Sequence, residues 1–188
     1  MGFEITIRLP EWMDEYLEWG RPYATVEDRM RFAIELARQN TARGTGGPFG
    51  AAIFETETGA LVAAGVNLVV PMRNSVLHAE IVAFMVGEQR LGSYTLAGDG
   101  RAAHELVTSC DPCAMCLGAT LWSGVKRVIC GADREDAGAI HFDEGPVFPE
   151  SYAYLAERGI EIVRGIMRDE ARQVLAAYAR TRGTIYNG

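Results

Sequence analysis

Apolar positions near the start of the chain follow first a helical and then a strand period. After Thr25, a good N-cap residue, they recur every three to four positions, which predicts a helix over 26–40. Apolar runs at 49–54 and 61–66 flank a turn at Gly59. These runs predict a hairpin of two antiparallel strands.

Helix and strand patterns alternate through the remainder of the chain. The further predicted helices cover 78–91, 113–122, 151–158 and 169–182, and the further predicted strands cover 105–109, 125–131 and 160–166. The last helix is expected to begin at an Asp169 cap and to stop at Gly183. Strands joined by crossover helices run parallel, whereas a hairpin pair is antiparallel. The predicted fold class is therefore α/β, a three-layer α/β/α sandwich around a mixed five-stranded sheet.

The length of the chain, 188 residues, fits one domain that buries a continuous core. No internal repeat or low-complexity linker divides it. We expect a single domain over 1–188, with an irregular lead-in over 1–24. A short tail over 184–188, which contains Ile185 and Tyr186, follows the last helix.

Charge and hydropathy narrow the range of partners. Acidic residues outnumber basic ones by 25 to 18, a formal net charge of −7, and the basic residues are scattered singly. This argues against a nucleic-acid partner, which needs a clustered basic surface. No stretch approaches the roughly 20 apolar residues of a spanning helix, and the first twenty residues do not resemble a secretory signal. We expect no membrane partner and a cytoplasmic location.

Two short strings carry the candidate chemistry: His78-Ala79-Glu80 and Pro112-Cys113-Ala114-Met115-Cys116. Cys113 and Cys116 share one face of a first helical turn, which suits tetrahedral zinc. Because residues two apart share no helix face, His78 and Glu80 converge on one ion only at a helix start. His78, Cys113 and Cys116 as ligands leave a fourth position for water, with Glu80 left to move its proton.

Cys110 leaves two alternatives open. A fourth thiolate would close the site and make it structural, although Cys110 lies on the strand side of Pro112. The overlapping C-x-x-C at 110–113 also fits a thioredoxin-like redox motif, which would leave His78 and Glu80 unexplained. Cys130, inside a predicted strand, is most simply a small buried hydrophobe.

The H-x-E and P-C-x-x-C combination is typical of zinc deaminases. The chain resembles the cytidine-deaminase-like superfamily and, within it, the bacterial guanine deaminases. The likeness runs in order over roughly 30–187. The matching segments are Gly46 to Ala51, Asn67, His78 to Glu80, Thr108-Ser109 leading into Pro112 to Cys116, Gly118-Ala119 and Phe142 to Pro146, with Asp111 standing where relatives commonly carry Glu.

The resemblance implies roles for individual residues. Zinc, one ion per subunit, would be bound by His78, Cys113 and Cys116, with Glu80 as the catalytic proton shuttle. Glu144 would be a second catalytic acid that contacts the substrate. The residues implied in substrate binding are Asn67, Phe49, Ala79, Asp143 and Tyr186. The resemblance also implies a homodimer that can exchange C-terminal segments, so that Tyr186 covers the partner's site.

Several of these residues also have purely structural interpretations. Asn67 after a strand is by default a turn residue, and Phe49 beside a Gly-Pro turn is by default part of the core. Glu144 in a loop bounded by Gly and Pro is by default solvated. His104 and His141 are expected to be surface or hydrogen-bonded polar residues rather than ligands.

The predicted function is zinc-dependent hydrolytic deamination of a purine base, guanine to xanthine plus ammonia. In this interpretation a zinc-held hydroxide attacks the base and Glu80 transfers the proton. The alternatives are deamination of another small substrate (cytosine, guanosine or an aminotriazine), deamination of tRNA adenosine, and a non-catalytic zinc module.

Overall fold

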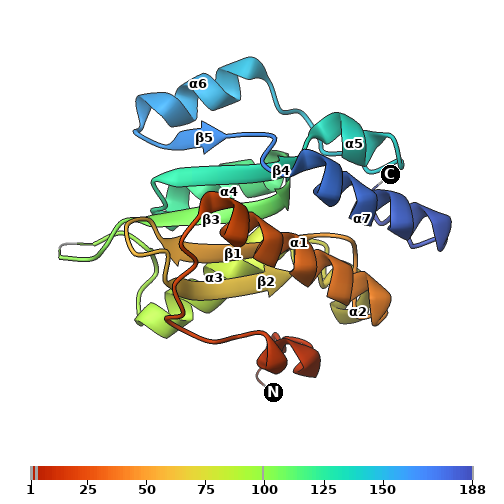
Figure 1. Ribbon diagram of the computed structural model, residues 1–188, viewed down its shortest axis with the longest axis horizontal. Helices are drawn as coiled ribbons and strands as arrows, with labels where there is room; N and C mark the ends of the chain where they lie inside the picture. Colours follow the sequence, from red (N-terminus) through yellow and green to blue (C-terminus); the bar gives the residue numbers. More distant parts are fainter. Residues whose placement is uncertain (1, 3, 99, 188) are drawn as a thin grey trace.

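The described part of the computed structural model, residues 2, 4–98 and 100–187, contains one mixed sheet of five strands (Figure 1). The strand order is β2-β1-β3-β4-β5. Residues 1, 3 and 188, which belong to the predicted lead-in and tail, lie outside this description. The strands are β1 Gly50–Glu55, β2 Leu61–Val66, β3 His104–Cys110, β4 Arg127–Ala132 and β5 Glu161–Val163.

The pairing of the strands matches the predicted mixture. The hairpin pair β1 and β2 is antiparallel, and β1 is also antiparallel to β3. β3, β4 and β5 run parallel, as expected for strands joined by crossover helices. β5 is shorter than the predicted strand over 160–166, because Gly165 adopts a positive φ of 79° and turns the chain out of the ladder.

The predicted helices all form, although with shifted ends. They are α1 Val26–Ala42, α3 Ala79–Leu91, α4 Ala114–Ser123, α6 Pro149–Glu157 and α7 Arg168–Arg180. The Thr25 cap is confirmed, since its side chain accepts a hydrogen bond from the Asp28 N–H. Three short helices were not predicted, because each is too brief to show a period: a 3-10 helix Glu11–Glu15 (η1), α2 Val69–Met72 and α5 Arg134–Gly138.

Both predicted ends of α7 are wrong. The N-cap is Met167, in a left-handed conformation, and Arg168 at the first helical position forms ion pairs with Asp133 and Asp136. These long-range contacts start the helix before Asp169. It ends at Arg180, and Gly183 serves a different purpose, because a Cβ there would lie 2.2 Å from Cζ of the Tyr178 ring.

Helices cover both faces of the sheet, as predicted. α1 and α7 pack on one face with α5 beside them, while α3, α4 and α6 pack on the other (Figure 1). α3 lies directly on β2 because Gly65 has no side chain: a Cβ there would be 2.3 Å from the Ala79 carbonyl oxygen. This close contact fixes where α3 begins.

One edge of the sheet gathers residues that are far apart in sequence. Because β1 runs opposite to β2 and β3, its start lies beside their ends, and Gly50 pairs with Val66 there. The residues just beyond the strands at this edge are Phe49, Asn67 and Asp111. None of the helices in the described ranges is long and apolar enough to cross a membrane.

Candidate active site

Three donor atoms of the kind that bind zinc meet where two helices begin. His78 is the N-cap residue of α3 and Cys113 that of α4, while Cys116 lies one turn into α4. Their ligand atoms all lie within 4.8 Å of one another, and His78 Nδ1 is 3.4 Å from Cys113 Sγ. The His78 side chain forms no capping hydrogen bond with its own helix. The donor set therefore fits zinc, with a fourth coordination position left for water.

The protonation of the two cysteines favours metal binding. A hydrogen bond from Cys116, and after it one from His78, outweighs burial and lowers the pKa of the Cys113 thiol to about 4. The hydrogen bond to Cys113, followed by burial, raises the pKa of Cys116. One ligand is thus a thiolate at neutral pH in the metal-free protein, which is the form that binds metal.

Two carboxyl groups lie against this donor set. Glu80, in the first turn of α3, is only 6% exposed, and its Oε2 accepts a hydrogen bond of 3.4 Å from Cys116 Sγ. Burial raises the pKa of Glu80. Burial, and then the negative charge of Cys113, raises the pKa of Glu144 to about 8. Carboxyl groups shifted towards neutral pH are suited to proton transfer.

The loop that carries Glu144 is anchored to its surroundings by backbone contacts. The Glu144 carbonyl accepts a hydrogen bond of 2.9 Å from the Ala114 N–H, next to Cys113. Arg134 donates to the Val147 carbonyl at 2.8 Å. Glu144 is thereby held at the start of α4 instead of being solvated.

The tail after α7 closes over this arrangement. Asn67 Nδ2 donates a hydrogen bond of 2.7 Å to Tyr186 Oη. The Tyr186 ring lies 5.0 Å from the Phe142 ring and 6.1 Å from the His78 imidazole, centroid to centroid. Asn187 Nδ2 donates to the Asp143 carbonyl at 2.7 Å, which joins the tail to the Glu144 loop.

A small cavity lies among these groups. It is lined by residues from six segments: Phe49, Asn67, His78, Glu80, Asp111, Cys113, Glu144, Tyr186 and Asn187. Its volume is about 10 Å³, close to the minimum for one water molecule. With the tail docked, the cavity therefore has room for about one water molecule.

The site matches a known sequence pattern. Residues 24–132 match the zinc-binding region of cytidine and deoxycytidylate deaminases. The chain belongs to this deaminase family. The matched segment contains both helix starts and all three donor residues, so the family match supports zinc as the metal for this donor set.

Relatives of this deaminase include enzymes that act on different substrates. A solved guanine deaminase from Nitrosomonas europaea shares 43% identity and a TM-score of 0.91, covering 96% of this chain and 98% of that one. A guanine deaminase from Bacillus subtilis is 37% identical over 71% of this chain and 81% of its own length. A tRNA-specific adenosine deaminase from Haemophilus influenzae is 31% identical over 83% of this chain and 84% of its own.

The structure brings most of the predicted site residues of the deaminase together. Phe49, Asn67, Glu144 and Tyr186 line the cavity with His78, Glu80 and Cys113. Two of the residues predicted to bind substrate, Ala79 and Asp143, lie next to lining residues but are not among them. Ala79 is fully buried at the start of α3, and the Asp143 carboxylate accepts a hydrogen bond from the Gly145 N–H.

Sequence reasoning missed two residues that line the cavity, Asp111 and Asn187. Asp111 attracted attention only as a departure from the family pattern. The available signals were its place immediately before Pro112 and the place of Asn187 next to Tyr186. Both signals depend on knowing that the end of β3 and the tail meet.

The remaining cysteines and histidines lie apart from the donor set. Cys110 is buried and its thiol donates to the Asp133 carbonyl at 3.5 Å, so it lies outside the three-residue cluster. This arrangement speaks against a closed structural zinc site. Cys130 is fully buried, His104 Nδ1 lies 2.8 Å from the Leu96 carbonyl oxygen, and His141 is exposed.

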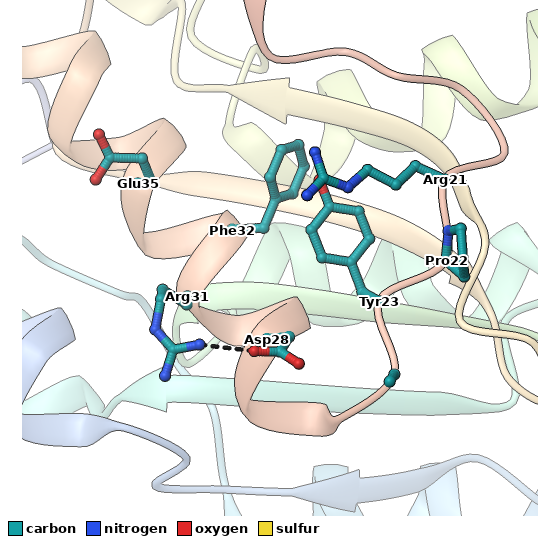
Figure 2. Close-up of a pocket in the computed structure, with 8 residues that line it drawn as sticks. Arg21, Pro22, Tyr23, Asp28, Arg31, Phe32 and Glu35 are labelled. Carbon is teal, nitrogen blue, oxygen red and sulfur yellow. Dashed lines mark hydrogen bonds and ion pairs between the residues drawn. The ribbon is translucent and has the colours of Figure 1, made fainter.

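A larger pocket of about 500 Å³ lies between α1 and the segment before it (Figure 2). Its charged side chains already have partners: Arg31 pairs with Asp28 at 2.8 Å, and Arg21 with Glu18. Tyr23 and Phe32 form its apolar wall. This pocket offers no cluster of metal donors or unpaired carboxyl groups, in contrast to the cavity at the helix starts.

Proposed function

We propose that this deaminase hydrolyses guanine to xanthine and ammonia. The observation that carries the proposal is the likeness to the Nitrosomonas europaea guanine deaminase, which extends over 96% of the chain. A cavity closed by buried side chains also favours a free base over a base within a polymer. The single donor cluster found among the described residues supports one zinc ion per chain.

In the proposed mechanism the protein positions the base and moves protons. His78, Cys113 and Cys116 would hold zinc, which when bound lowers the pKa of a coordinated water and so supplies the nucleophile. Glu80 would accept a proton from the attacking water and transfer it to a ring nitrogen of the base. Glu144, which burial makes easier to protonate, donates a proton to the departing amine. Water and guanine are thereby converted to xanthine and ammonia.

Substrate binding requires the tail to move. We assign Asn67 to hydrogen bonding with the base, because its amide already meets a polar group, Tyr186 Oη, inside the cavity. Phe49 would pack against the base, and the loop around Asp143 and the backbone of Ala79 would border it. Tyr186 then covers the bound base instead of filling its place.

An ammonia-release assay with a panel of bases tests the substrate. We expect guanine to be turned over, with much lower rates for adenine, cytosine, guanosine, cytidine and aminotriazines. Zinc-loaded protein that releases ammonia from another member of the panel but not from guanine would contradict the proposal. Apoprotein prepared with a chelator is the control, and it should recover activity when zinc is added back.

Deamination of adenosine in tRNA is the second candidate, favoured by the Haemophilus influenzae relative. The net charge of −7 and the scattered basic residues weigh against it. An unfractionated tRNA arm in the same assay separates the two candidates. Salt-sensitive tRNA binding and inosine formation would favour the second candidate over the first.

We further propose a homodimer, because α4 contains no charged residue and yet reaches the surface. Trp122 near its end is 80% exposed, and Leu121, Tyr154 and Val147 line an apolar groove beside it. Uncharged helices of this kind are usually covered. Sedimentation analysis at micromolar protein concentration measures the oligomeric state, and a monomer would contradict this part of the proposal.

Removal of residues 184–188 should lower guanine turnover by about tenfold or more, with zinc content unchanged, because the cover of the base is lost. Steady-state kinetics and metal analysis measure the two quantities. Tyr186→Phe, which keeps the ring and removes only the hydroxyl that meets Asn67, is the matched control and should lose less. Unchanged kinetics in the truncated protein would contradict a role for the tail.

Mixing two inactive proteins shows which protomer the tail serves. Truncated protein has an intact Glu80, and full-length Glu80→Gln protein has an intact tail. If dimers exchange tails, mixed dimers place the donated tail over an intact site, and activity returns after mixing and re-equilibration. If each tail covers its own chain, as the contacts of Tyr186 in this structure are arranged, mixing restores nothing.

A further inference from the structure

The Asp111 carboxylate lines the cavity, and the proposed mechanism gives it no task. Asp111 follows β3, lines the cavity beside Cys113 and is only 2% exposed. Its Oδ1 is fully buried and has no hydrogen-bond partner within the described residues. A buried carboxyl oxygen without a hydrogen-bond partner is costly, so an unpaired one on a residue that lines a cavity points to a ligand that supplies the missing hydrogen bond.

Arg164 fixes the orientation of this carboxylate. Its guanidinium, in the turn between β5 and α7, pairs with Asp111 Oδ2 and lies 5.2 Å from the Tyr152 ring centroid. The Asp111 N–H is held as well, by the Ala132 carbonyl at 2.8 Å. With Oδ2 paired and the backbone fixed, Oδ1 remains as a hydrogen-bond acceptor without a donor.

The position of Asp111 indicates which group of a bound base could donate a hydrogen bond to it. The carbon that undergoes hydrolysis must lie next to the metal donors, and Asp111 is two residues from Cys113 on the same cavity wall. In guanine the N–H donor attached to that carbon is the 2-amino group, which leaves as ammonia. We infer that Asp111, positioned by Arg164, accepts a hydrogen bond from the 2-amino group of the bound base. This assignment rests on the proposed function, because it takes guanine as the substrate.

The Cys130 thiol offers a competing partner for the carboxylate. Burial, followed by the charge of Asp111, raises the pKa of this thiol, so it is a protonated donor nearby. A hydrogen-bond interaction with Asp111 also raises the pKa of Cys130, although Oδ1 itself has no partner within normal hydrogen-bond limits. Cys130→Ala therefore separates the two explanations: it should leave ligand binding unchanged if the free oxygen serves the base.

The experiment compares two ligands that differ only in the 2-amino group. Zinc-loaded Glu80→Gln protein, in which turnover is slow, is titrated calorimetrically with guanine and with hypoxanthine. In this background Asp111→Asn should weaken the binding of guanine by about tenfold or more and change the affinity for hypoxanthine by less than about twofold. The amide keeps its one oxygen for Arg164 and turns its NH₂ towards the amino group, so that donor meets donor.

Arg164→Met provides a second variant that leaves the carboxylate in place. Because the Asp111 carboxylate loses its orientation, the binding of guanine should weaken more than that of hypoxanthine. The effect should be smaller than that of Asp111→Asn. Zinc content of each variant is measured first, so that a damaged metal site is recognised. If both variants weaken the two ligands equally, or neither ligand at all, the inference is overturned.

Failure of this inference differs from failure of the proposed function. If wild-type protein releases no ammonia from guanine, the proposed function is wrong whatever Asp111 does. If guanine is turned over but the Asp111 variants do not discriminate between guanine and hypoxanthine, only the role of Asp111 is wrong. Equal weakening in Cys130→Ala and Asp111→Asn would assign the free oxygen to the thiol.

Discussion

Glu80→Gln should retain stoichiometric zinc and lose guanine turnover by about 10²- to 10⁴-fold, the range for removal of a positioned acid-base group. Glutamine has nearly the same shape as glutamate, but it cannot carry a proton. Metal analysis and ammonia release on the same preparation give both values.

Glu88→Gln is the matched control for this variant. Glu88 lies two turns later on α3 and lines a different pocket, on the surface beside the N-terminal segment. It should keep wild-type turnover. Substantial activity in zinc-loaded Glu80→Gln protein would show that the proton is carried by another group, and Glu144 would then be the next candidate.

Cys113→Ala should lower zinc affinity by more than about 100-fold and abolish turnover. This loss of affinity is larger than that expected when only a residue hydrogen-bonded to a metal ligand is removed. The reason is that Cys113 both binds the metal and is the thiolate of the metal-free site. Competition with a chromogenic chelator measures the affinity.

Cys110→Ala is the control that separates a catalytic from a structural metal site. Cys110 is three residues away from Cys113, equally buried, and bonded to the Asp133 carbonyl instead of to the donor cluster. It should therefore keep zinc and activity. If Cys110→Ala released the metal, four protein ligands would be present and the open position required for hydrolysis would not exist.

The sequence was sufficient to predict the chemistry wherever it depends on local geometry. Cys113 and Cys116 lie one helical turn apart. His78 is the N-cap residue of α3, as the convergence of His78 and Glu80 on one ion requires, and Cys113 is the N-cap residue of α4. The five strands and their mixed directions also followed from local periods and connection types.

Features that depend on long-range contacts were not predictable in the same way. The early start of α7 is set by Arg168 pairing with Asp133 and Asp136, more than thirty positions away. Asn67 and Tyr186 meet across a separation of 119 residues. Periodicity contains no information about such contacts, so the pairing of Asp111 with Arg164 was missed as well.

The docking of the tail has a practical consequence for handling the protein. Tyr186 and Asn187 form part of the cavity wall, and Gly183 packs against the Tyr178 ring just before them. An affinity tag or fluorescent fusion joined after these residues would begin next to the segment that lines the cavity and would compete with its placement. Fusions should be attached at the other terminus, and a preparation that has been clipped at the carboxyl end should not be used to judge specific activity.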